Sequence, residues 1–227
     1  MVVKTIVVSK TVKGSLQNSR CGFESCSSCN KQNITPITLP SFDLLEPVIS
    51  KEALQIHYTQ YYLKYVERVN EFYQSHSWVS NTDTLEDLIL ILDPNQGPYN
   101  NASQVWNHEF FFTQFTRNKN TQIGKKFERI LNTSRYKSIQ NFIDNCIRIS
   151  SLHFGSGYLW VYLDEDRRLV VETRNNAENL VKRRRCIPIL CIDLWEHSYY
   201  SNYYSDRALY VEKILIQIDW NIIETRL

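Results

Sequence analysis

The spacing of bulky apolar residues changes near residue 155, and that change limits the folds available to this chain. Before it, apolar and aromatic residues recur three and four positions apart, which is typical of amphipathic helices. Ser50, with Glu52 behind it, predicts the start of a long helix that continues to Tyr73. We expect a loop at Gly97-Pro98. Further helices are predicted over residues 84–92, 102–115, 124–131 and 138–150.

After residue 155, short runs rich in β-branched and aromatic residues predict strands. The predicted strands are residues 158–163, 168–173 and 186–193, and helical spacing returns over residues 194–204 and 208–218. These elements predict an α+β protein. In it, an N-terminal helical hairpin domain precedes an α/β domain whose three-stranded antiparallel sheet is flanked by helices.

Composition divides the chain into three parts. Residues 1–37 are basic, rich in Ser and Thr, and free of acids before Glu24. This predicts a targeting presequence for an organelle, a mitochondrion or a plastid. The alternative is a flexible extension of a cytoplasmic protein. Residues 38–118 form the predicted helical domain, and residues 119–227 form the predicted α+β domain.

Charge and cysteine usage exclude several classes of protein. The net charge of +2 is too small to indicate nucleic-acid binding, and no apolar run is long enough to span a membrane. The cysteines near the start include a CxxC that has no second pair at zinc spacing and no nearby histidine, so we assign no role to Cys21, Cys26 and Cys29. The cysteines of the body are predicted to be reduced and buried: Cys146, Cys186 and Cys191.

Three histidines stand in a similar setting on predicted helices, among bulky aromatic residues: His57, His108 and His197. Asp193 stands one helical turn before His197, and alone this pair would suggest a salt-linked surface turn. Three imidazoles and one carboxylate, however, form a ligand set for a divalent or trivalent metal with open coordination positions. The set has no thiolate, which argues against a structural zinc site.

Helical spacing adds candidates beside this ligand set. His57, Tyr61 and Tyr65 are four residues apart and would line one stripe of a helix. The Tyr65 phenol could then guard an entrance and relay protons. Gln104 precedes His108 by one turn, so its carboxamide could form a hydrogen bond with solvent on the metal.

Four segments, in this order, resemble the iron/manganese superoxide dismutase family. They cover nearly the whole chain from about Ile37 onward. The segments are residues 39–70, "ASQVWNHEFFF" at 102–112, "FGSGYLWVYL" at 154–163, and residues 192–220, which contain "DLWEHSYY".

The resemblance implies an activity and a role for each matching residue. The protein would convert two superoxide anions and two protons to O₂ and hydrogen peroxide by redox cycling of a mononuclear metal. The implied metal ligands are His57, His108, Asp193 and His197. The implied catalytic residues are Tyr65 and Gln104, which would supply protons together with solvent.

The resemblance also implies a homodimer, in which Glu196 would reach the ligand histidine of the other subunit and Tyr200 would lie in the contact. The residues expected around the ligands or at that contact are Tyr61, Trp106, Trp160, Trp195, Glu196 and Tyr200. The expected partners are thus superoxide and a second copy of the chain, with neither nucleic acid nor membrane.

The position of the glutamine favours iron over manganese. In the iron type the active-site glutamine precedes the second ligand histidine, which is where Gln104 stands. In the manganese type it comes from the loop after the second strand, where this chain has Ala177. We therefore expect one iron ion per subunit, because the placement of this hydrogen-bond donor tunes the reduction potential of the metal.

The chain also departs from the family pattern, which marks it as a divergent member. Tyr61 stands where the family has a histidine that bonds the partner's tyrosine, matched here by Tyr200. Tyr158 and Phe112 replace tryptophans. The alternative reading is a catalytically weak or inactive descendant that acts as a structural or interaction subunit. The basic run Lys182–Arg185 is expected to be a solvated loop, with steering of the anion as the alternative.

Overall fold

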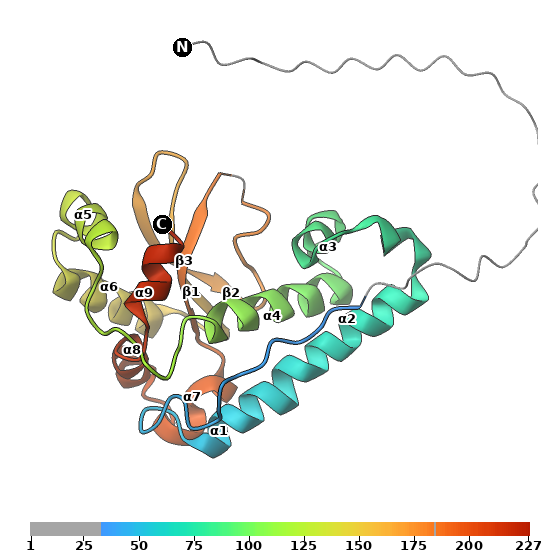
Figure 1. The fold of residues 1–227 in the computed structure, drawn as a ribbon, viewed down its shortest axis with the longest axis horizontal. Coiled ribbons are helices and arrows are strands. Elements are labelled where there is room, and N and C mark those ends of the chain that lie inside the picture. The colour runs from blue at the N-terminus through green and yellow to red at the C-terminus, as the bar shows by residue number, and fades with distance from the viewer. Residues whose placement is uncertain (1–32, 184) are drawn as a thin grey trace, which may run out of the picture. The chain divides into compact units, whose positions relative to one another are not determined.

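The computed structural model describes residues 33–183 and 185–227 (Figure 1). Cys21, Cys26, Cys29 and most of the predicted presequence lie outside the described residues. The helices are α1 (Lys51–Ile56), α2 (Leu63–Ser75), α3 (Leu85–Ile91), α4 (Gly97–Phe112), α5 (Lys125–Thr133), α6 (Ile139–Leu152), α7 (Glu196–Tyr203), α8 (Arg207–Leu215) and α9 (Trp220–Thr225). A π-helical segment, η1 (His57–Tyr62), joins α1 to α2, and a 3-10 segment, η2 (Ser77–Asn81), follows α2. The strands are β1 (Gly157–Leu163), β2 (Leu169–Asn175) and β3 (Ile187–Asp193).

The N-terminal half is a helical hairpin. The Ser50 hydroxyl accepts a hydrogen bond from the amide of Ala53, so the predicted N-cap is confirmed. The segments α1, η1 and α2 then continue as one long helix that packs against α4 (Figure 1). The loop predicted at Gly97-Pro98 is wrong, because these residues form the first turn of α4. Proline is well suited to this position, where its missing N–H would have no partner in the helix.

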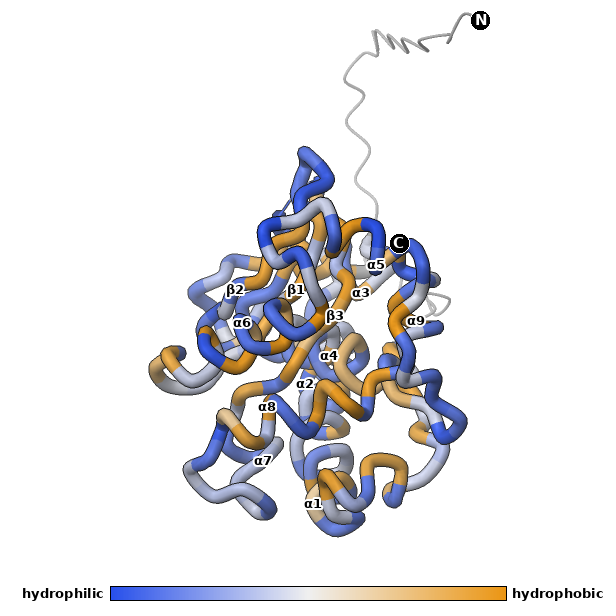
Figure 2. Tube along the Cα trace, turned by 90° about the vertical axis from the view of Figure 1, so that its left-hand side faces the viewer, coloured by the Kyte–Doolittle hydropathy of each residue, from blue (hydrophilic) through white to orange (hydrophobic). Residues whose placement is uncertain are grey.

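The C-terminal half is built on an antiparallel sheet with the strand order β2-β1-β3. The central strand, β1, is buried along its whole length, and Figure 2 shows the hydrophobic residues that run through the strands. The helix α6 packs against α8 and against β2, while α4 packs against β3. The predicted fold class, with helices around a three-stranded antiparallel sheet, is therefore confirmed.

Two further details of the described chain differ from the sequence predictions. The helix α9 was not expected; Asp219 caps it by accepting from the amide of Asn221. Cys146 and Cys191 are reduced and buried as predicted, whereas Cys186 is reduced but only half-buried.

Residues 33–37, the part of the predicted presequence that the structure describes, form hydrogen bonds with the helical hairpin. The amide of Ile34 donates to the Asn70 side chain, which donates back to the Ile34 carbonyl. The amide of Ile37 donates to the Tyr62 hydroxyl at 2.8 Å. Residues 33–37 thus belong to the folded unit. The predicted boundaries at residues 37 and 118 stay predictions.

Candidate metal centre

Four side chains from four elements meet where the hairpin faces the sheet. His57 is the first residue of η1 and His108 lies near the end of α4, while Asp193 ends β3 and His197 lies in the first turn of α7. One ligand atom from each residue lies within 4.8 Å of all the others. Because α4 packs on β3 and α1 packs on α7, the fold itself brings the four together.

The geometry of this cluster fits a bound cation. Oδ2 of Asp193 lies 3.2 Å from Nε2 of His57, 3.6 Å from Nε2 of His197 and 3.9 Å from Nε2 of His108. These four buried atoms have no hydrogen-bond partner within the described part of the chain. Buried polar atoms are nearly always paired, so four unpaired atoms aimed at one point indicate a shared partner. Three nitrogens and one carboxylate oxygen suit a borderline metal ion.

Hydrogen bonds to the far side of two ligands fix which atom faces the centre. Nδ1 of His108 lies 2.6 Å from the backbone oxygen of Gln104 and donates to it, which leaves the lone pair on Nε2. The amide of Trp195 donates to Oδ1 of Asp193 at 2.8 Å, which leaves Oδ2 for the centre. Both arrangements are local, because the donor and acceptor are within one turn of each other.

The strand that carries Asp193 is also tied to the hairpin. The side chain of Gln114, which follows α4, is fully buried and donates to the carbonyl of Cys191 at 2.5 Å. It accepts from the amide of the same residue at 3.2 Å. This pair of bonds ties β3 to the residues that follow α4, and no local sequence pattern predicts it.

Protonation of the ligands is set by burial and by their mutual contacts. Burial lowers the pKa of His108 to about 3, and the pKa of His57 is lowered by burial as well. Burial opposes ionisation of Asp193, but the imidazoles of His197 and His57 outweigh it and hold the pKa of that carboxyl well below its usual range. His57 and His108 are therefore neutral and Asp193 is anionic, which are the forms that bind metals.

Aromatic rings surround the cluster. Tyr61 stacks on His197 with ring centroids 4.0 Å apart, and Tyr65 lies 5.6 Å from the ring of His108. The ring of Phe112 lies 5.0 Å from His57. The stripe predicted for His57, Tyr61 and Tyr65 thus faces the cluster, but its first half is π-helical rather than α-helical.

The tryptophans expected near the ligands form a second layer. Trp160 is fully buried on β1, and its ring centroid lies 5.4 Å from that of Trp106. Trp195 lies 5.8 Å from His197. Glu196 and Tyr200 are both exposed on α7 and line a shallow surface pocket with Tyr204. Neither side chain is covered by its own chain, so both are available for contact with another molecule.

Tyr158 is a site residue that the sequence reasoning did not assign. Its hydroxyl donates to Oε1 of Gln104 at 2.6 Å, and both side chains are buried. Burial and the charge of Asp193 raise the pKa of Tyr158 well above its usual value, so the phenol stays protonated and can donate. The replacement of tryptophan at residue 158 was visible in the sequence, but the bond joins residues 54 positions apart.

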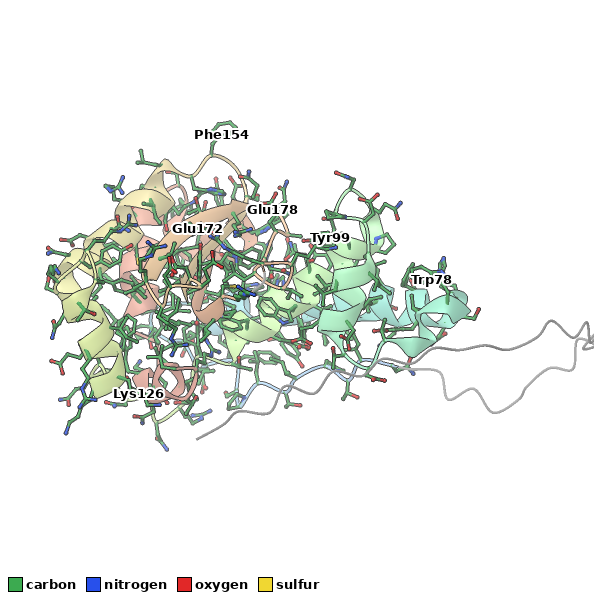
Figure 3. All side chains as sticks on the ribbon, turned by 90° about the horizontal axis from the view of Figure 1, so that it is seen from above. Trp78, Tyr99, Lys126, Phe154, Glu172 and Glu178 are labelled. Atoms are coloured by element: carbon green, nitrogen blue, oxygen red, sulfur yellow. The ribbon has the colours of Figure 1, made fainter. Side chains whose placement is uncertain are left out.

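A cavity leads from the surface towards Gln104. Its volume is about 450 Å³, and Tyr65, Gln104 and Trp195 are among the residues that line it. Tyr99 and Glu178 also line it, and Figure 3 shows both residues on neighbouring segments. No lysine or arginine is among its described lining residues. The cavity gives a small solute a route to the Gln104 amide.

The basic run expected in a solvated loop is partly engaged in other contacts. Lys182 donates to the carbonyls of Leu90 and Leu92 at 3.0 and 2.7 Å, and so caps the end of α3. Arg183 pairs with Glu172 at 3.1 Å. These two cations therefore stabilise the loop and α3, and neither lines the cavity.

Comparison with known proteins adds independent evidence. Residues 37–116 match the family model of iron/manganese superoxide dismutases, alpha-hairpin domain, and residues 124–226 match that of the C-terminal domain. The chain is 34% identical to an iron superoxide dismutase of Plasmodium falciparum over 82% of the chain and 93% of the relative. It is 34% identical to a Mn/Fe superoxide dismutase of Porphyromonas gingivalis, over 84% of the chain and 97% of the relative. It is 35% identical to the chloroplastic iron superoxide dismutase 3 of Arabidopsis thaliana, over 82% of the chain and 71% of the relative.

Proposed function

The chain belongs to the iron/manganese superoxide dismutase family and is a superoxide dismutase, and on this basis we propose that its four-residue cluster holds one iron ion per subunit. The proposed ligands are His57, His108, Asp193 and His197. The observation that carries the proposal is the convergence of four buried, unpaired ligand atoms on one point. Such an arrangement costs stability unless a cation is bound there.

The reaction converts two superoxide anions and two protons to O₂ and hydrogen peroxide. A bound iron ion would supply the redox chemistry, taking an electron from one superoxide and giving one to the next. Asp193 is the one carboxylate of the proposed ligand set, so a bound ferrous or ferric ion would leave a net positive charge there that attracts superoxide. The cavity beside Gln104 supplies the route of entry.

Two side chains that line this cavity, Tyr65 and Gln104, are proposed to form a hydrogen-bonded path for protons from solvent. Because Tyr158 donates to Oε1 of Gln104, the amide nitrogen of Gln104 is left to donate towards the centre. Burial and the charge of Asp193 raise the pKa of Tyr65, so its phenol is protonated at neutral pH. Tyr65 can therefore hold a proton beside the site, while the Gln104 amide can hold solvent there by donating a hydrogen bond.

The choice of iron over manganese rests on Gln104. This residue lies on α4 one turn before His108, and the loop after β2 carries Ala177 instead of a glutamine. One of the similar proteins is named for both metals, so a direct test is needed. Metal-free protein would be loaded with iron or manganese and assayed for superoxide dismutation. Activity with iron alone is expected, and activity with manganese alone would overturn the choice of metal.

A homodimer is proposed through the surface around α7. The exposed residues Glu196 and Tyr200 line a surface pocket there with Arg207. Arg207 donates to the carbonyls of His153 and Gly155, the two neighbours of Phe154 in the chain. Phe154 is 97% exposed, and Figure 3 shows its side chain pointing away from the fold. An exposed apolar patch of this kind is typical of an interaction surface.

An organelle is the proposed location, with a plastid or a mitochondrion as the candidates. The basic, acid-poor composition of residues 1–37 supports this, and one similar protein is named chloroplastic. Among the described helices, none is both long and apolar enough to cross a membrane. Cell fractionation, followed by N-terminal sequencing of the mature protein, tests the location and the cleavage of the presequence together. Uncleaved protein in the cytoplasm would contradict both.

A further inference from the structure

Tyr61 lies flat against one of the proposed metal ligands. Its ring centroid is 4.0 Å from that of His197, and the two planes differ by 12°. His57, at the other end of the same π-helical turn, meets His197 edge-on at 4.8 Å. One turn of helix therefore presents both a ligand and a stacking ring to the imidazole of His197.

This contact matters because the His197 ring is held by ring contacts and not by a hydrogen bond from Nδ1 to a described residue. Nδ1 of His108 is fixed by the carbonyl of Gln104, whereas no hydrogen bond joins Nδ1 of His197 to a described residue. The His197 side chain is 7% exposed, and its ring meets His57 edge-on at 4.8 Å and lies tilted 5.8 Å from Trp195. A metal-bound imidazole normally needs such an outer contact to hold its ring plane.

The other tyrosines of the π-helical segment are held through their hydroxyls. The Tyr58 hydroxyl donates to the carbonyl of Ile37 at 2.5 Å, and the Tyr62 hydroxyl donates to Glu109 at 2.9 Å. The Tyr61 hydroxyl has no such bond within the described chain. Its ring face is therefore the part of Tyr61 that contacts the site.

We propose that Tyr61 is a positioning residue that fixes the plane of His197 by ring stacking and thereby slows release of the bound metal. This role rests on the proposed metal site. It leaves Nδ1 of His197 available to a group from outside the subunit, such as Glu196 of a second copy. The π-helical geometry of this segment supports the arrangement. The amide of Leu63 donates to the carbonyl of Tyr58, five residues earlier, as expected for a π-helix.

The test compares Tyr61→Leu, which removes the ring, with Tyr61→Phe, which removes only the hydroxyl. Each protein is loaded with iron, and release of the metal to excess EDTA is followed over time. We expect release to be about tenfold faster in Tyr61→Leu and unchanged in Tyr61→Phe, as for loss of an outer contact on a ligand. The electron paramagnetic resonance spectrum of the ferric protein should change in the leucine variant alone.

Thermal unfolding of the metal-free variants separates this role from a general loss of stability. Tyr58→Leu serves as the matched control, because it breaks a tether in the same segment and should leave iron release unchanged. Tyr61→Gln replaces the leucine variant if that protein does not fold. The role of stacking would be overturned if a folded variant without the ring released iron at the wild-type rate. It would also be overturned if Tyr61→Phe released iron as fast as Tyr61→Leu. Failure of the wild-type protein to bind iron would instead refute the metal site on which the role rests.

Discussion

The hydroxyl of Tyr158 donates a 2.6 Å hydrogen bond to Oε1 of Gln104. This bond decides which way the amide faces, since a tyrosine that is kept protonated by burial acts as the donor. The amide nitrogen is then the only part of the Gln104 side chain that can donate towards the metal centre. A residue of the central strand thus sets the orientation of a residue on α4.

Replacing Tyr158 by phenylalanine is expected to lower the turnover rate without emptying the site. The buried oxygen of Gln104 would lose its partner, and the amide would be free to rotate. We expect a loss of about tenfold in kcat with unchanged iron content. Tyr162→Phe, at a fully buried tyrosine on the same strand, is the control and should retain activity. Equal activity of both variants would show that the bond does not orient Gln104.

The sequence predicted the fold well because apolar periodicity carries the information. The helix that begins at Ser50 and the three strands were visible as spacing alone. Gly97-Pro98 was misread because the same residues favour a loop and the first turn of a helix. The π-helical turn at His57–Tyr62 was invisible, since an i→i+5 bond leaves no distinct pattern in a short segment.

The candidate site could be predicted in part. The ligand set followed from residue types in matching aromatic settings, and the structure brings those four residues together. The contacts of Tyr158 and Gln114 could not be predicted, because each joins residues more than fifty positions apart across two elements. The engagement of Lys182 with the end of α3 is a long-range contact of the same kind.

Glu178 places a negative charge on the wall of the cavity through which superoxide is proposed to enter. At a separation of roughly 10 Å in water, two unit charges interact by about 0.4 kcal/mol, which corresponds to about a twofold change in rate. Glu178→Gln should therefore raise kcat/KM about twofold at low ionic strength, and the gain should vanish in high salt. The control is Glu165→Gln, which makes the same charge change at an exposed residue outside the cavity. Equal effects in both variants would contradict a local role.

Acid should destabilise the metal-free protein through its buried histidines. The pKa of His108 is about 3 in the folded state, against about 6.5 in an unfolded chain, so the unfolded state binds more protons between these values. The free energy of unfolding should then fall as the pH is lowered below about 6.5, by roughly 1.4 kcal/mol per pH unit for each such histidine. Burial also lowers the pKa of His57, so this residue contributes in the same direction.

Urea titrations of the metal-free protein between pH 7 and pH 5 measure this slope. His108→Asn removes one of the titrating groups, so its slope should be shallower by roughly 1.4 kcal/mol per pH unit. An identical slope in wild type and variant would mean that His108 is not held neutral by burial.

The proposed dimer can be tested at Phe154, which makes little contact with its own chain. Phe154→Asp should leave the fold of one subunit intact, since the side chain is 97% exposed. A charge in an apolar contact should convert the dimer to a monomer, as measured by analytical ultracentrifugation. Trp78→Asp, at a 55% exposed residue well away from Phe154 (Figure 3), is the control and should stay dimeric. A dimeric Phe154→Asp protein would place the contact elsewhere.

The most direct test of the account is to measure metal content and superoxide dismutation together in wild type and His108→Ala. We predict one iron ion per wild-type chain with full activity, and loss of both in the variant, because His108 supplies one of the four converging ligand atoms. His76→Ala, at a histidine outside the cluster, should behave as wild type. Iron and activity retained in His108→Ala, or iron-loaded wild type without activity, would contradict the account.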